Sequence, residues 1–252
     1  MATKKAENIN NSYFDGYYKE IWRSIIPNEF TVKETDFLVQ YFNLKQGSKV
    51  LDIMCGYGRH AIGLARKGIQ VTAVDNLDDY INEIKQIEEK ENLPITAVRN
   101  DLLLFKADET FDLCICMGNS LNFFDAEETQ NIFSLVSSHL NPGGSFLINT
   151  WSITEIICNN FKSRSWEKSG DLTFLTECKF LFQPARMEID SIIIAPDGTT
   201  ETKKAVDYIF SLNEMEQMLN RAGLILKENY SVPGRKNFAI GDARAYLVAE
   251  KK

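Results

Sequence analysis

The sequence predicts an α/β protein built on a doubly wound, mostly parallel sheet of seven strands, with a small antiparallel β insertion. Three observations carry this prediction. A short apolar run at residues 49–53 leads directly into a glycine turn and then into a helical pattern. Strand-like and helix-like segments then alternate four times in succession, which requires parallel crossovers. After residue 151 the pattern changes to β-rich runs, expected at residues 172–182, 186–195 and 199–210.

Five parallel strands and a final hairpin make up the predicted main sheet. The strands are expected at residues 49–53, 70–75, 95–99, 111–117 and 145–150, and the hairpin at residues 224–230 and 243–250. The run 111–117 is apolar almost throughout, as is typical of a parallel strand that is buried on both faces. A turn at residues 141–144 is expected before the fifth strand.

Capping motifs predict where three helices begin. Each motif has two parts. The first is a side chain that can accept a hydrogen bond from a free helical amide, and the second is a glutamate three residues later. The pairs are Thr31 with Glu34, Asp125 with Glu128, and Ser211 with Glu214. The first of these helices is expected to end near Gly47.

Composition argues against several classes of protein. A net charge of −7 is unsuited to general nucleic-acid binding, which needs a basic face. The first residues have no apolar core of a secretory signal, and no apolar run is long enough to span a bilayer. Five cysteines without zinc-like spacing fit a reducing compartment. We therefore expect a soluble, cytoplasmic protein with no nucleic-acid or membrane partner and no metal.

In an open parallel sheet, a ligand lies beyond the carboxyl ends of the strands. The helix that follows the glycine turn presents free amides at its N-terminus, which suits a nucleotide-like ligand. Gly56 and Gly58 have no Cβ, so the turn can be sharp and a ligand can come close. The residues at the strand ends are Asp52, Met54, Gly56 and Gly58, then Asp75 and Asn76, then Asp101 and Leu102, and finally Met117, Gly118 and Asn119.

This set of residues resembles the class I S-adenosylmethionine-dependent methyltransferases, over residues 48–150 and again over 211–250. The resemblance implies a Rossmann-like methyltransferase fold and S-adenosylmethionine as the cofactor. It implies that the turn of Gly56 and Gly58 lies against the methionine part of the cofactor, with Asp52 organising the loop and the amino group. It also implies a ribose contact for Asp75, adenine contacts for Asn76, Asp101 and Leu102, and contacts behind the methionine part for Met117, Gly118 and Asn119.

The arrangement is also similar to sugar-amine N-methyltransferases, which share an aromatic N-terminal lid and a β insertion. That similarity implies that Tyr13 and Tyr18 cover the cofactor, while a packing role for these rings is equally open. Arg59 is expected either to pair with the cofactor carboxylate or to lie solvated at the start of its helix. One departure is Met54, which stands where the family usually has glycine, so either a less tight turn or a slightly displaced cofactor is expected. The pattern of base-methylating enzymes is absent after residue 117.

The resemblance divides the chain into four segments. They are an N-terminal helical lid at residues 1–46, a cofactor-binding core at 47–150, a β insertion at 151–210, and a C-terminal helix and hairpin at 211–252 that complete the core sheet. The insertion is expected to cover the acceptor or to mediate a homodimer contact, and the sequence does not choose between these roles.

The predicted function is in-line methyl transfer to a nitrogen or oxygen of a small-molecule acceptor, with no catalytic residue assigned. Of the two histidines, His139 is expected to be structural at a helix end, and His60 either packs or lines the site. Two alternatives remain open at this stage. Gly56 and Gly58, with Ala61 after them, also fit the pattern of a nicotinamide-dependent oxidoreductase. Met54 leaves room for a catalytically silent cofactor-binding protein.

Overall fold

The computed structural model describes residues 8–232 and 234–252. Its α-helices are α1 (Tyr17–Ile25), α2 (Asn28–Tyr41), α3 (Arg59–Ala65), α4 (Asp78–Glu91), α5 (Ala126–His139), α6 (Thr154–Asn160) and α7 (Leu212–Arg221), and its 3-10 helices are η1 (Ile9–Ser12), η2 (Leu102–Leu104) and η3 (Ser120–Phe123). Its strands are β1 (Lys49–Ile53), β2 (Gln70–Asp75), β3 (Ile95–Arg99), β4 (Phe111–Cys116), β5 (Leu140–Thr150), β6 (Arg164–Ser169), β7 (Leu172–Phe182), β8 (Ala185–Ile194), β9 (Thr200–Tyr208), β10 (Leu224–Val232), β11 (Lys236–Asn237) and β12 (Ala245–Lys251).

These elements form two compact units. One comprises residues 28–160 and 210–252, and the other comprises residues 161–209 with the described part of residues 1–27. The first 46 residues, which the sequence grouped as one segment, are therefore shared between the units. Helix α1 belongs with the insertion, whereas α2 belongs with the core.

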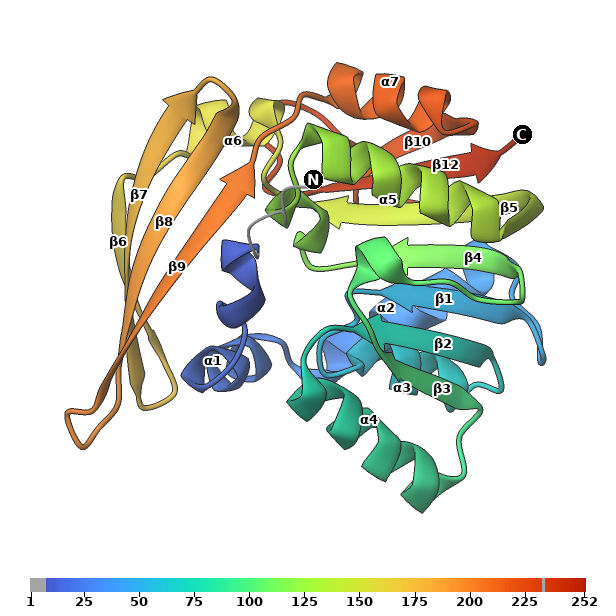
Figure 1. Ribbon diagram of the computed structural model, residues 1–252, viewed down its shortest axis with the longest axis horizontal. Coiled ribbons are helices and arrows are strands. Elements are labelled where there is room, and N and C mark those ends of the chain that lie inside the picture. The colour runs from blue at the N-terminus through green and yellow to red at the C-terminus, as the bar shows by residue number, and fades with distance from the viewer. Residues whose placement is uncertain (1–7, 233) are drawn as a thin grey trace, which may run out of the picture. The chain divides into compact units, whose positions relative to one another are not determined.

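The core unit contains the predicted main sheet, in the strand order β11-β10-β12-β5-β4-β1-β2-β3 (Figure 1). Strands β1 to β5 are parallel, and β12 and β10 are antiparallel additions beside β5. The seven predicted strands are confirmed, and the short β11 adds an eighth. Because β1 lies between β2 and β4, the crossovers run in opposite directions on its two sides. The carboxyl ends at this switch point are where open sheets bind ligands.

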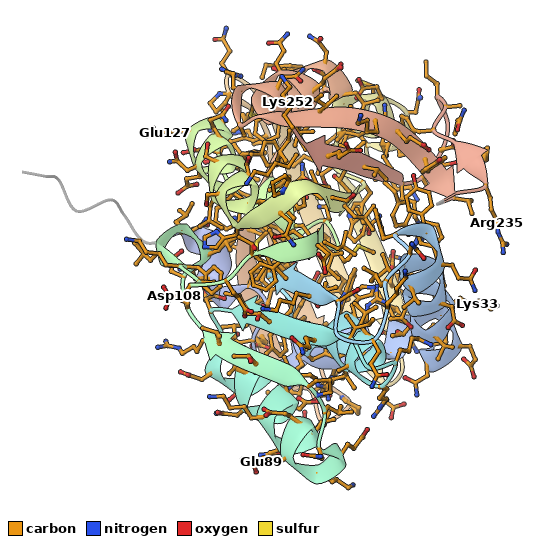
Figure 2. All side chains as sticks on the ribbon, turned by 90° about the vertical axis from the view of Figure 1, so that its right-hand side faces the viewer. Lys33, Glu89, Asp108, Glu127, Arg235 and Lys252 are labelled. Carbon is orange, nitrogen blue, oxygen red and sulfur yellow. The ribbon has the colours of Figure 1, made fainter. Side chains whose placement is uncertain are left out.

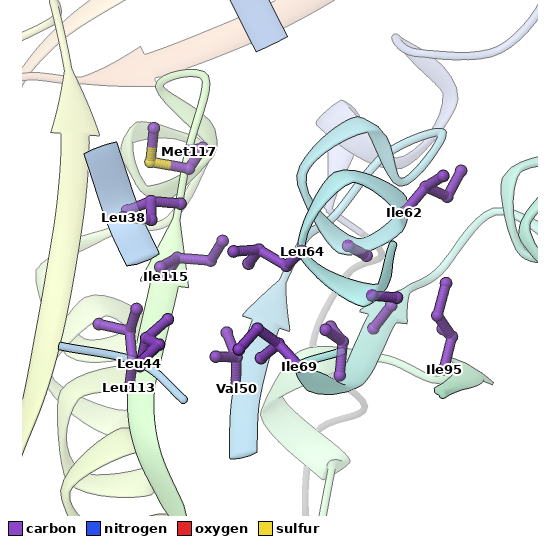
Figure 3. Packing of buried hydrophobic residues seen from close by; sticks show 14 of the residues in the cluster. Leu38, Leu44, Val50, Ile62, Leu64, Ile69, Ile95, Leu113, Ile115 and Met117 are labelled. Carbon is purple, nitrogen blue, oxygen red and sulfur yellow. The ribbon is translucent and has the colours of Figure 1, made fainter. Parts of the chain in front are cut away.

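Helices cover both faces of the main sheet, as a doubly wound fold requires. Helices α2 and α3 lie behind it and α5 lies in front of it in the view of Figure 1. On the α3 side, Val50 and Ile115 are fully buried and pack with Leu38 of α2 and Leu64 of α3 (Figure 3). Burying an aliphatic side chain of this size stabilises a fold by about 1.5–3 kcal/mol. This cluster therefore fixes β1 and α3, which flank the glycine turn.

The start of α2 differs from the prediction. The helix begins at Asn28, directly after Pro27, and ends at Tyr41, so Thr31 lies inside it and is not its capping residue. The predicted box fails because the Glu34 carboxylate is bound by Arg59 and His60. The other two boxes are confirmed, with both reciprocal hydrogen bonds present at Asp125 and at Ser211.

The turn predicted at residues 141–144 is an irregularity within β5. The strand runs from Leu140 to Thr150, and its pairing with β4 shifts register between Phe111 and Leu113. Gly143 has a positive φ of 75°. A Cβ on Gly144 would lie 2.8 Å from the carbonyl oxygen of Asn141, so the backbone can close on itself only at a glycine. The chain bends here without leaving the sheet.

The second unit is built on a four-stranded antiparallel sheet, β6-β7-β8-β9. Three of its strands lie close to the β-rich runs that the sequence predicts, whereas β6 was missed. Five of its six residues are exposed, so it has no apolar alternation that could reveal it. The N-terminal segment belongs to this unit, because the amide side chain of Asn10 exchanges two hydrogen bonds with the main chain of Val206 in β9.

Charged side chains lie on the outward faces of the surface helices. Lys33 of α2, Glu89 of α4 and Glu127 of α5 are all exposed and project from the ribbon (Figure 2). This distribution is that of amphipathic helices which bury only one side. Among the described helices, none has the length and apolar character needed to cross a membrane.

Candidate functional site

The carboxyl ends of β1 and β2 are tied together by Asp75. Its carboxylate accepts a hydrogen bond from the Gly56 amide at 2.9 Å through Oδ2 and from the Leu77 amide at 3.0 Å through Oδ1. Burial raises the pKa of Asp75, while these amides oppose that shift. One carboxylate thus holds both the glycine turn and the loop after β2. The Asn76 amide binds the same carboxylate, which can accept about four hydrogen bonds in all.

The two glycines of the turn have different surroundings. Gly58 has a φ of 75°, and a Cβ there would lie 2.6 Å from Cγ1 of Ile84 in α4. Gly56 also has a positive φ, of 57°, but a Cβ there would meet no atom within 4 Å. Gly58 is therefore required by the packing of α4, whereas the space beside Gly56 is open. A ligand can approach the backbone at Gly56.

Met54 adopts the backbone conformation that a glycine would. Its φ is 53°, in the left-handed region, which costs an L-residue about 1–2 kcal/mol. The turn therefore keeps its left-handed path with a side chain present, and it carries some strain. The sequence predicts a less tight turn at this position, but the structure shows a strained residue.

Asp52 is a buried carboxylate with an unsatisfied oxygen. Its side chain is 1% exposed, and Oδ2 has no hydrogen-bond partner among the described residues. Burial raises the pKa of Asp52 to about 7; the positive charge of Arg59 opposes this shift and the negative charge of Asp75 adds to it. Leaving such an atom unsatisfied costs about 1–3 kcal/mol. An ammonium group or another donor bound at the glycine turn would remove this cost.

Arg59 and His60, at the start of α3, converge on Glu34 of α2. Arg59 donates through Nη1 to Glu34 and, at 3.2 Å, to Thr31. His60 Nε2 lies 3.1 Å from the same Glu34 oxygen, and the Tyr246 hydroxyl donates to the other at 3.4 Å. Arg59 is thus paired and largely buried, which excludes the solvated role considered for it.

The ionisation states in this cluster follow from burial and charge. Burial disfavours a charged Glu34, but the hydrogen bond from His60 and the charge of Arg59 outweigh it and lower its pKa to about 2. Burial and the charge of Arg59 lower the pKa of His60, although Glu34 opposes that shift. His60 is therefore neutral near pH 7 and donates its Nε2 proton to Glu34. Sequence reasoning missed Glu34, and its position four residues before the buried Leu38 was the available signal.

The loop after β4 is organised by two buried asparagines. Asn119 has a φ of 68°, and its Oδ1 accepts hydrogen bonds from Thr150 Oγ1, from the Trp151 amide and from the Ser152 amide. Asn122 donates to the Ser152 carbonyl oxygen at 2.8 Å. Both side chains therefore bind the segment after β5. The predicted cofactor contacts of Met117, Gly118 and Asn119 remain predictions.

Asp101 and Leu102 lie in the loop after β3. Asp101 is exposed and caps η2 by accepting the Leu103 amide at 3.0 Å, whereas Leu102 is buried. The Asn100 amide donates to the main-chain oxygen of Asp75 at 3.0 Å, which joins this loop to the end of β2. The structure therefore brings Asp52, Asp75 and the Asp101 loop to one edge of the sheet. Their contacts with the cofactor, and that of Asn76, stay predictions.

Tyr13 and Tyr18 belong to the other unit. The Tyr13 hydroxyl lies 3.1 Å from Ser191 Oγ, and burial raises its pKa to about 12. The Tyr18 ring lies 4.7 Å from the Tyr13 ring and 6.0 Å from that of Phe174. These contacts make the rings part of the core of their own unit. A role for them over the cofactor is not tested by these contacts.

His139 has the structural role that the sequence predicts. Its Nε2 accepts the Ala107 amide at 3.0 Å, so the proton is on Nδ1, which donates to the Leu135 carbonyl oxygen at 2.8 Å. The side chain thereby closes the last turn of α5.

Comparison with known proteins shows similarity to methyltransferases over part of the chain. Residues 50–144 match the sequence family described as a methyltransferase domain. A probable S-adenosyl-L-methionine-dependent methyltransferase, TehB of Haemophilus influenzae, is 32% identical over 100 residues, which cover 40% of this chain and 35% of that protein. The chain spans between 35% and 63% of the length of the first five curated relatives.

Solved structures extend the similarity of fold to most of the chain. The methyltransferase CcbJ from Streptomyces caelestis superposes with a TM-score of 0.78 at 18% identity, covering 91% of this chain and 98% of that one. CalS10, an amino pentose methyltransferase from Micromonospora echinaspora, superposes with a TM-score of 0.71 at 16% identity, covering 94% and 98%. At such identities the similarity concerns the fold.

Residues 50–144 therefore resemble a methyltransferase domain, and the sheet order matches the fold of S-adenosylmethionine-dependent methyltransferases. Sugar N-methyltransferases are among the chain's neighbours in fold, as the resemblance in sequence implied. The buried oxygen of Asp52, which has no hydrogen-bond partner among the described residues, would suit the ammonium group of such a cofactor.

Proposed function

We propose that the chain transfers the methyl group of S-adenosylmethionine to a nitrogen or oxygen of a small-molecule acceptor. The observation that carries this proposal is the unsatisfied, buried Asp52 carboxylate beside an open glycine turn, in a matched methyltransferase domain. Amino pentose, glycine/sarcosine and ubiquinone-pathway methyltransferases among the relatives support a small acceptor.

The residues at the strand ends supply binding and orientation. Asp52 would hold the ammonium group, the carboxylate of Asp75 would accept the ribose hydroxyls, and the backbone at Gly56 would lie against the methionine part. When bound, the cofactor supplies a methyl group that its sulfonium already activates. What the protein adds is in-line positioning of the acceptor, an effect that can contribute about 7–11 kcal/mol.

No acid or base of this chain is assigned to the reaction. An acceptor amine would react once it is unprotonated, whereas a hydroxyl acceptor would need a base. His60 is neutral, but it is buried and donates to Glu34, so it is occupied as a structural donor. These features favour an amine acceptor over a hydroxyl, because the amine needs no further proton acceptor among the residues described here.

The test is a binding and turnover experiment on the full chain. Calorimetry should show binding of S-adenosylmethionine and S-adenosylhomocysteine but not of NADH. Release of S-adenosylhomocysteine should then depend on an acceptor, screened as amino sugars, amino acids and phenols. Binding of NADH without either adenosyl ligand would overturn the proposal, and turnover on a phenol alone would overturn its preference for amines.

The insertion and the compartment are part of the same proposal. We propose that residues 151–210 cover the acceptor or join two copies of the chain, as the sequence implied. Removing the insertion should abolish acceptor-dependent turnover in the first case, and should change the oligomeric state measured by light scattering in the second. A cytoplasmic location rests on the cysteine usage, and fractionation of cells would test it.

A further inference from the structure

Glu34 is the shared acceptor for residues that adjoin the glycine turn. Its Oε2 is bound by Arg59 and by His60, which directly follow Gly58, and its Oε1 accepts the Tyr246 hydroxyl. These groups come from α2, from the start of α3 and from β12. The Glu34 and Arg59 side chains are each 12% exposed, and that of His60 is 4% exposed. Solvent therefore screens this ion pair only weakly.

The guanidinium of Arg59 is hydrogen-bonded through one of its nitrogen atoms, Nη1. In the described part of the chain its hydrogen bonds run through Nη1, to Glu34 and Thr31. A guanidinium carries five donors in a planar fork, so Nε and Nη2 remain able to bind a second anion. The charge of Arg59 also acts on Asp52, since it opposes the rise in the pKa of that carboxyl. Arg59 is thus held by the Glu34 carboxylate, and its charge acts on the unsatisfied carboxylate at the glycine turn.

We propose that Glu34 is a positioning residue for the amino-acid end of the cofactor. It holds Arg59 at the start of α3, so that the free guanidinium donors bind the cofactor carboxylate while Asp52 receives the ammonium group. By neutralising part of the charge of Arg59, it also prevents Arg59 from forming an ion pair with Asp52. This inference rests on the proposed function, because it requires the cofactor at the glycine turn.

Two ligands separate this role from a general structural one. S-adenosylhomocysteine carries the amino-acid end, whereas 5′-methylthioadenosine has the same adenosine and sulfur without it. Glu34→Gln keeps the size of the side chain and removes its charge. We expect its Kd for S-adenosylhomocysteine to rise about tenfold, as loss of one charge-assisted hydrogen bond would cause. Its Kd for 5′-methylthioadenosine should stay within about twofold of the wild-type value.

A matched control lies on the same two elements. Asp36 of α2 pairs with Lys67, just after the end of α3, at 2.6 Å, so Asp36→Asn removes an α2–α3 ion pair away from the glycine turn. This variant should bind both ligands as the wild type does. Glu34→Asp, which keeps the charge on a shorter side chain, serves as a second variant if Glu34→Gln does not fold, and it should show the same selective loss.

The outcomes are distinct. Selective weakening of S-adenosylhomocysteine supports the positioning role. Equal weakening of both ligands, or no change in either, overturns it while the proposed function stands. Wild-type protein that binds neither ligand would overturn the proposed function and this inference with it.

Discussion

At the scale of single residues, the site combines one strained backbone with one unsatisfied charge. Met54 holds a left-handed φ of 53°, and Asp52 has a buried oxygen without a partner. Both lie within three residues at the end of β1. Each makes the protein less stable than a relaxed arrangement would. Under the proposed function, the ammonium group of the cofactor would remove the second cost.

The strain at Met54 can be measured against a matched pair of variants. Met54→Ala keeps a Cβ in the left-handed region, whereas Met54→Gly removes it, and both remove the rest of the side chain. We expect the glycine variant to exceed the alanine variant in free energy of unfolding by about 1 kcal/mol, because relief of strain outweighs the added chain entropy. Urea denaturation measures the difference. Equal stabilities would show that the backbone is unstrained.

The raised pKa of Asp52 predicts a pH dependence of cofactor binding. Below about pH 7 the carboxyl is protonated and must lose its proton to pair with an ammonium group. The affinity for S-adenosylhomocysteine should therefore rise from about pH 5 to pH 7, by at most tenfold per unit, and then level off. Glu34, with a pKa of about 2, does not titrate in this range.

Calorimetric titrations across that range test the sign of the effect. Asp52→Asn is the control, because it cannot ionise; it should bind more weakly at pH 7 and lose this pH dependence. The pKa shifts of His60 and Asp75 persist in that variant, so any residual slope belongs to these two groups. A wild-type affinity that falls as pH rises would contradict the assignment.

At the scale of elements, the glycine turn is set by helices as well as by its own sequence. The missing side chain of Gly58 leaves room for Ile84 of α4. The carboxylate of Asp75, at the end of β2, accepts a hydrogen bond from the Gly56 amide. The motif was readable from the sequence because a short β-prone run, two close glycines and a helical pattern are all local features. The neighbours that make Gly58 necessary come from a different helix, and no local pattern reveals them.

This difference predicts unequal costs for the same substitution. Gly58→Ala combines a positive φ with a Cβ 2.6 Å from Ile84, whereas Gly56→Ala has the positive φ alone. We expect the loss in unfolding free energy to be about 1 kcal/mol for Gly56→Ala and larger by about 1–3 kcal/mol for Gly58→Ala. Adding Ile84→Ala should reduce the penalty for Gly58→Ala. A penalty equal at both glycines would mean that α4 yields without cost.

Three elements differ from the sequence prediction, each for a different physical reason. The capping box at Thr31 was wrong because the pattern does not show that Arg59 and His60 take the Glu34 carboxylate. Strand β6 was missed because its residues are largely exposed. Strand β5 begins earlier than predicted because residues on both sides of the bend at Gly143 and Gly144 pair with β4. Only at the capping box does the deciding interaction join residues distant in sequence.

At the scale of the whole molecule, the N-terminal segment and the insertion form one unit although about 130 residues separate them. Asn10 is 4% exposed and bonds to both main-chain groups of Val206. Tyr13 and Tyr18 add aromatic contacts in the same unit. The aromatic stretch that the sequence singled out therefore packs within this unit, and its role over the cofactor stays a prediction.

Asn10→Ala should act on this unit alone. Loss of the two hydrogen bonds leaves the main chain of Val206 unpaired, at a cost of about 1–3 kcal/mol to local stability. Hydrogen exchange measured by mass spectrometry should quicken in η1 and β9 and stay unchanged in β1 and β4. Faster exchange throughout the core sheet would show instead that the two units unfold together.

The sequence by itself determined the main sheet, the glycine turn and the acidic residues at the strand ends, because these depend on periodicity and on local backbone freedom. Through the motif that these residues form, it also predicted the class of cofactor. Only the tertiary structure decided that Glu34 binds Arg59, that Asn119 and Asn122 hold the segment after β5, and that the N-terminal rings belong with the insertion. These depend on which distant side chains meet, and burial then fixes their charge and their hydrogen bonds.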